Sequence, residues 1–95
     1  MSAKPHRPEG MIDYTDASRR RLLALARAAF DALPSGEDFS IEYLMDRAFI
    51  AASVRGCRDE AAFARDVGAL ILTLCRGGMA ARTEGAGLVK MWGKA

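Results

Sequence analysis

The sequence predicts a mainly helical domain that ends in a small β-hairpin, and three observations support this prediction. Apolar residues within 59–76 recur at the spacing of an amphipathic helix. Two earlier stretches, near 15–33 and 40–56, each begin at a capping residue and continue with residues that favour helix. After a Gly-Gly pair, the remaining stretch MAARTEGAGLVKMWGKA holds two short runs of strand-forming residues on either side of Gly-Ala-Gly. The chain is therefore expected to change from helix to hairpin near residue 78.

Length and composition indicate one folded domain with a short arm. The chain has 95 residues, of which 51% are hydrophobic and 27% are charged, as in ordinary globular proteins. Lys and Arg number 14 and Asp and Glu number 12, and the net charge of +2 permits a polyanionic partner without requiring one. Residues 1–12 hold two prolines and little apolar content, so we expect a flexible N-terminal arm before a domain over 13–95.

The first helix is expected from Thr15 or Asp16 to Leu33. Either residue is a good N-cap, and the Pro-Ser-Gly sequence that follows Leu33 stops the helix. Three consecutive arginines, 19–21, point in directions about 100° apart, so they form no single patch and are expected in solvent. The predicted apolar face comprises Leu22, Ala26, Ala29 and Leu33, with Leu23 and Phe30 beside them.

The second helix is expected to begin at Ser40. This residue suits an N-cap, and Phe39 and Leu44 on either side form a hydrophobic staple. The preceding GEDF can supply one short strand, and Gly56 suits the C-cap of the helix. The predicted buried face comprises Leu44, Met45, Ala48, Phe49 and Ala52.

The third helix is expected from its N-cap Asp59 to Arg76, where two glycines end it. Its predicted core stripe is Phe63, Val67, Leu70 and Leu74, at i, i+4, i+7 and i+11. The hairpin strands are then expected over 79–83 and 88–92. Alternation along the second strand leaves two choices for its inward face, either Leu88 with Trp92 or Val89 with Met91.

This order of helix, short strand, helix, helix and hairpin resembles the winged helix-turn-helix superfamily over about residues 15–93. The segments that carry the resemblance are FSIEYLMDRAFIAA, DEAAFARDVGALILTLCRGG and MAARTEGAGLVKMWG. The resemblance implies a three-helix DNA-binding fold, with the third helix in the major groove and the hairpin as a wing on the DNA backbone. Two features depart from the usual pattern: the link SVRGCR is longer than a tight turn, and the third helix carries acidic residues that phosphates would repel.

The face of the third helix opposite its core stripe suits close approach to a groove. Small residues alternate there with arginine, which makes bidentate contacts to guanine or phosphate. On the hairpin, a basic residue in each strand is a candidate for phosphate contact. The face opposite the stripe comprises Ala61, Arg65, Gly68, Ala69, Leu72 and Arg76. The predicted DNA-binding residues are Arg58, Arg65, Ala69, Arg76, Arg82 and Lys90.

Two functional classes follow from these residues. The favoured one is a small DNA-binding protein, a transcriptional regulator of plasmid or phage type that acts as a dimer on double-stranded DNA. The alternative is a winged helix that binds protein, as an adaptor or inhibitor of a larger complex, for example a phage anti-defence protein. In that case Gly68, Ala69 and Leu72 would form a dry contact and the arginines would serve solubility.

Catalysis, metal binding and membrane insertion are not expected. His6 is the only histidine and lies in the arm, which leaves the domain without a histidine acid or base. Cys57 and Cys75 lack CxxC spacing and a histidine partner, and an intervening helix would hold them roughly 25 Å apart, too far for a disulfide. No cofactor is implied. The sequence has no apolar run of membrane-spanning length and no signal peptide, so we expect a cytoplasmic protein.

Overall fold

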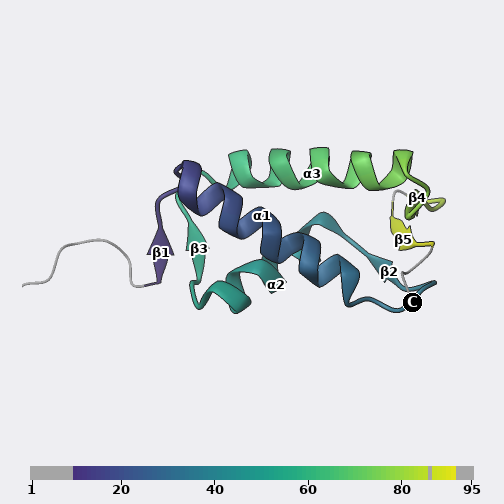
Figure 1. Cartoon of the computed structure of the whole chain (residues 1–95), viewed down its shortest axis with the longest axis horizontal. Coiled ribbons are helices and arrows are strands. Elements are labelled where there is room, and N and C mark those ends of the chain that lie inside the picture. The colour runs from purple at the N-terminus through teal and green to yellow at the C-terminus, as the bar shows by residue number, and fades with distance from the viewer. Residues whose placement is uncertain (1–9, 86, 92–95) are drawn as a thin grey trace, which may run out of the picture.

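The computed structural model describes residues 10–85 and 87–91, and these contain three helices and five short strands (Figure 1). The helices are α1 (Asp16–Asp31), α2 (Ile41–Ala52) and α3 (Glu60–Arg76). The strands are β1 (Met11–Ile12), β2 (Asp38–Phe39), β3 (Gly56–Cys57), β4 (Ala80–Arg82) and β5 (Leu88–Lys90). The predicted class, mainly α with small strands, is confirmed.

α2 and α3 begin at the N-caps that the sequence predicts, and α1 begins at Thr15, one of the two candidates considered. The side-chain oxygens of Thr15, Ser40 and Asp59 each accept a hydrogen bond from the backbone N–H three residues later. These bonds satisfy N–H groups that have no partner within the helix itself. In α1 the bond is reciprocal, because the side chain of Ser18 accepts from the backbone N–H of Thr15 at 2.8 Å.

The helix ends agree with the sequence in α3 and differ in α2. Gly77 and Gly78 follow α3, and Gly78 has φ +80°, a conformation that glycine adopts without strain. The predicted C-cap at Gly56 is wrong, because α2 ends at Ala52 and Ser53 takes the left-handed conformation with φ 61°. Gly56 lies in β3 instead.

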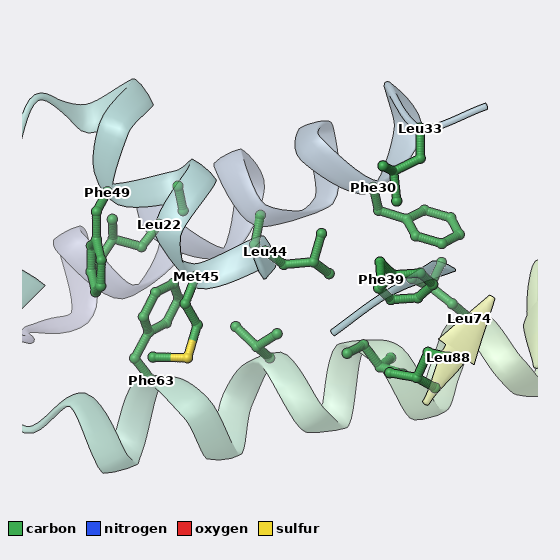
Figure 2. Packing of buried hydrophobic residues seen from close by; sticks show 14 of the residues in the cluster. Leu22, Phe30, Leu33, Phe39, Leu44, Met45, Phe49, Phe63, Leu74 and Leu88 are labelled. Atoms are coloured by element: carbon green, nitrogen blue, oxygen red, sulfur yellow. The ribbon is translucent and has the colours of Figure 1, made fainter. Parts of the chain in front are cut away.

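The hydrophobic core lies between the three helices and the sheet formed by the hairpin and β2. Figure 2 shows the core side chains along α3, with Phe49 and Phe63 at one end and Phe30 and Phe39 at the other. The ring centroids lie 5.3 Å apart in the first pair and 5.4 Å apart in the second. Full burial of each such aromatic side chain contributes roughly 1.5–3 kcal/mol to folding. Leu44 is fully buried between the two ends.

The core stripe of α3 differs from the predicted one by one residue. Ile71 is 5% exposed, whereas Leu70 is only half-buried, so the prediction of Leu70 as a core residue is wrong. Both residues are apolar, and Leu70 lies about 20° and Ile71 about 80° from Phe63 around the helix, on opposite sides. Periodicity alone allows either choice. The buried residues of α3 are Phe63, Val67, Ile71 and Leu74.

The hairpin forms a three-stranded antiparallel sheet in the order β2-β5-β4. Leu88 pairs with Phe39 on one side and with Arg82 on the other, and the N–H of Thr83 donates to the carbonyl of Gly87 at 2.9 Å to close the hairpin. The strand predicted within GEDF is therefore β2. Of the two inward faces considered, the Leu88 face is buried, and Trp92 lies outside the described residues.

A second sheet, absent from the prediction, joins β1 to β3 in parallel. Met11 pairs with Gly56 and Ile12 pairs with Cys57. The carbonyl of Gly10 also accepts from the N–H of Arg55 at 2.6 Å. The predicted flexible arm over 1–12 is thus wrong for residues 10–12, which belong to the folded domain. The rest of the predicted arm, with Lys4, His6 and Arg7, lies outside the described residues.

Candidate nucleic-acid interface

One side of α3 is exposed along most of its length, and we call it the outer face of α3. Figure 1 shows α3 along one edge of the molecule, with α1 and α2 both on the same side of it. At about 100° per residue, the side chains opposite the buried stripe point away from the core. The outer face comprises Ala61, Arg65, Ala69, Leu72 and Arg76, all of them exposed.

Two arginines lie near the centre of this outer face. Arg65 and Arg76 are eleven positions apart, which corresponds to roughly 16 Å along the helix axis. Within residues 10–85 and 87–91, neither guanidinium takes part in an ion pair. Ala69 lies between them and adds little bulk, so a partner can approach the helix closely. Leu72 is 44% exposed on the same face and adds an apolar contact.

Arg58 and Arg82 lie at the surface in different surroundings. Arg58 precedes α3, and its Nε lies 3.2 Å from Oδ1 of Asp13, so its charge is partly compensated. Arg82 ends β4 and is exposed on the hairpin, with no ion pair among the described residues. Of the predicted site residues, Arg65, Ala69 and Arg76 therefore share one face, while Arg58 and Arg82 belong to neighbouring elements.

Lys90 does not belong to this surface, and its prediction as a phosphate contact is wrong. The side chain is only 2% exposed. Its Nζ donates hydrogen bonds to the carbonyl oxygens of Phe30, Asp31 and Leu33 at 3.0, 3.0 and 2.7 Å. The first two carbonyls lie at the C-terminal end of α1, where helical donors run out and the helix dipole is negative, and the third lies just beyond the C-cap Ala32. Lys90 thus caps α1 from the hairpin.

Two signals in the sequence pointed toward this role of Lys90. Alternation places Lys90 on the same strand face as Leu88, which is buried. The last turn of α1 has no basic residue of its own to interact with its carbonyls. Charged residues are rarely buried, however, and that general expectation favoured an exposed lysine.

Two of the three acidic side chains near the start of α3 are engaged in local contacts. Asp59 accepts a hydrogen bond as the N-cap. Oδ2 of Asp66 accepts from the hydroxyl of Tyr14 at 2.6 Å and from Nε of Arg19 at 3.2 Å. Partial burial and the hydrogen bond to Asp66 raise the pKa of the Tyr14 hydroxyl. The contact between Arg19 and α3 was not predicted.

A shallow groove between α1 and α2 is a second surface feature. Its volume is about 240 Å³, and it is mostly apolar, with Leu25 and three alanines on the α1 side. Tyr43 and Arg47 contribute the larger side chains from α2, and Ile50 is also exposed on this helix. The groove is lined by Leu25, Ala28, Ala29, Ala32, Tyr43, Arg47 and Ala51.

The two thiols differ in their surroundings. Cys57 is 1% exposed, and burial, together with the nearby charges of Glu60 and Asp59, raises the pKa of its thiol. Cys75 is half-buried, and both cysteines are free. In the part of the chain that the structure describes, no three His, Cys, Asp or Glu residues gather where they could hold a metal ion. None of the described helices is both long and apolar enough to cross a membrane.

Comparison of the chain with protein-family models, curated proteins and solved structures finds no match.

Proposed function

We propose that this domain is a winged helix-turn-helix that binds double-stranded DNA. In this proposal the outer face of α3 enters the major groove, and the hairpin of β4 and β5 contacts the DNA backbone as a wing. The order of the three helices and the hairpin supports this assignment. So does the sheet order β2-β5-β4, in which the strand between α1 and α2 pairs with the last strand of the hairpin.

The observation that supports DNA binding most strongly is the composition of the outer face of α3. Arg65 and Arg76 lie there without ion-pair partners in the described chain, and Ala69 between them permits close approach. A guanidinium offers five N–H donors in a planar arrangement that fits phosphate or the edge of guanine. Arg82 extends the basic residues onto the hairpin.

Two of the three acidic residues near the start of α3 oppose this function less than the sequence alone suggests. Asp66 lies on the flank of the helix and interacts with the guanidinium of Arg19 at 3.2 Å, which compensates its charge. Asp59 is at the capping end, away from the middle of the outer face.

The proposed role is that of a cytoplasmic transcriptional regulator of plasmid or phage type, acting as a dimer on two half-sites.

A titration of the purified protein into a fluorescein-labelled, mixed-sequence DNA duplex tests this proposal by fluorescence anisotropy. The affinity is expected to fall steeply between about 50 mM and about 200 mM salt, because phosphate contacts release counterions. An absence of binding at the lower salt concentration would contradict the proposal.

The second candidate is a protein-binding module, an adaptor or inhibitor of a larger complex. The exposure of Leu72 at the centre of the outer face favours it, because an apolar side chain suits a dry protein contact. This alternative predicts no salt-dependent DNA binding. It also predicts that Leu72→Ser abolishes partner capture while Arg65→Ala leaves it intact.

A further inference from the structure

Arg19 of α1 is held against α3 by an interaction with Asp66. Its Nε donates to Oδ2 of Asp66 at 3.2 Å, and the same oxygen accepts from the hydroxyl of Tyr14 at 2.6 Å. The ring of Tyr14 in turn lies 5.8 Å from the ring of buried Phe63, centroid to centroid. The carboxylate is therefore oriented by a residue that itself packs on the core.

The interaction with Asp66 uses only one of the donor groups of Arg19. A guanidinium has five N–H donors, and no hydrogen bond among the described residues engages the two terminal nitrogens of Arg19. The side chain is 48% exposed, so these nitrogens remain accessible to a ligand. Arg19 thus resembles neither a fully paired arginine nor a freely mobile one.

Asp66 places this guanidinium beside the outer face of α3. Asp66 directly follows Arg65, and the two side chains diverge by about 100° around the helix axis. Arg65 lies near the centre of the outer face, and Asp66 lies on the flank that faces Tyr14 and α1. A backbone phosphate beside the α3 surface would therefore meet Arg19 at this flank.

We propose that Arg19 is a further phosphate-binding residue of the DNA surface and that Asp66 is its positioning residue. This inference rests on the proposed DNA-binding function. A guanidinium that is already oriented loses less conformational freedom when it binds phosphate, which favours binding. The remaining N–H donors then form charge-assisted hydrogen bonds to the phosphate oxygens.

For Asp66→Ala, the positioning role and simple charge repulsion predict opposite changes in DNA affinity. If Asp66 only repels phosphates, Asp66→Ala removes a negative charge and tightens DNA binding. If Asp66 positions Arg19, the same substitution weakens binding although the protein becomes more positive. In the Arg19→Ala background, Asp66→Ala should cause no further weakening, because the residue that it positions is absent.

The test measures DNA affinity by anisotropy over a range of salt concentrations for Arg19→Ala, Asp66→Ala and the double variant. Arg21→Ala is the matched control, since Arg21 is exposed two positions later and points to another side of α1. Loss of one phosphate contact in Arg19→Ala should reduce the slope of log K against log salt concentration by about one. Arg21→Ala should leave this slope unchanged. Circular dichroism melting verifies that each variant is folded.

The possible results separate this inference from the proposed function. Weaker binding by both Arg19→Ala and Asp66→Ala supports the positioning role. Tighter binding by Asp66→Ala, or equal effects of Arg19→Ala and Arg21→Ala, overturns the inference but leaves the proposed function in place. If the unaltered protein does not bind the duplex at all, both are overturned.

Discussion

The ammonium group of Lys90 lies 4.9 Å from the centroid of the Phe30 ring and also donates a hydrogen bond to the carbonyl oxygen of Phe30 at 3.0 Å. The two residues are 60 positions apart, so this contact joins the last strand to the first helix. The hairpin is thereby fixed to the helical part of the domain by a buried charge as well as by apolar packing.

Replacement of Lys90 by Met should destabilise the fold while keeping a side chain of similar length. Three carbonyl oxygens at and just after the end of α1 each lose a hydrogen bond from the ammonium group, and hydrogen bonds to charged groups contribute roughly 1.5–3 kcal/mol. Urea unfolding measures the change in the free energy of unfolding. Arg82→Met, in the same hairpin but exposed, is the control and should change stability by no more than about 0.5 kcal/mol. Equal stability of both variants would contradict the capping role of Lys90.

The core stripe of α3 predicts that two neighbouring substitutions lower the free energy of unfolding by different amounts. Ile71→Ala removes a side chain that is 5% exposed and should lower the free energy of unfolding by about 2–5 kcal/mol. Leu70→Ala should cost clearly less, because Leu70 is only half-buried. Urea unfolding of both variants gives the comparison. A larger loss for Leu70→Ala would contradict the burial of Ile71 and place Leu70 in the core instead.

The thiols should differ in their rates of alkylation. Cys75 is half-buried and is expected to react first with iodoacetamide, whereas Cys57 is buried and its raised pKa keeps it protonated near neutral pH. Mass spectrometry of a time course at pH 7.5, with and without urea, separates the two sites. Rapid modification of Cys57 in the folded protein would contradict its burial.

The same pKa shift predicts how stability depends on alkaline pH. Because the folded thiol of Cys57 has a raised pKa, its contribution to the free energy of unfolding is fully present below the pKa of the unfolded thiol. It is lost as the pH rises through the higher folded pKa, since the unfolded state releases its proton first. Urea unfolding at several alkaline pH values should show a smaller loss of stability for Cys57→Ala than for the unaltered protein.

Much of the helical framework could be predicted because its signals are local. Thr15, Ser40 and Asp59 act as N-caps through bonds to residues three positions away, and the Gly77-Gly78 pair ends α3 through its own backbone freedom. Such interactions depend on short spacings that are visible in the sequence. They place the starts of all three described helices and the end of the last one.

The missed features depend on contacts between distant segments. The pairing of Met11 with Gly56 involves two-residue strands, too short to show alternation in the sequence. The burial of Lys90 depends on carbonyls that end a helix some sixty residues earlier. Arg19 was expected in solvent with its neighbours, and only the packing of α1 against α3 brings it to Asp66. Local patterns do not show which distant segments pair, even where alternation places Lys90 on the same strand face as Leu88.

The central claim, that the outer face of α3 binds DNA, is tested most directly by the salt dependence of duplex binding for Arg65→Ala/Arg76→Ala. A matched control with the same change in net charge is Arg21→Ala/Arg47→Ala, since Arg47 lines the groove between α1 and α2. We predict that the α3 variant binds more weakly, with a salt slope reduced by about two and an unchanged melting temperature, while the control retains the original slope. Equal binding by the unaltered protein and the α3 variant would contradict the claim.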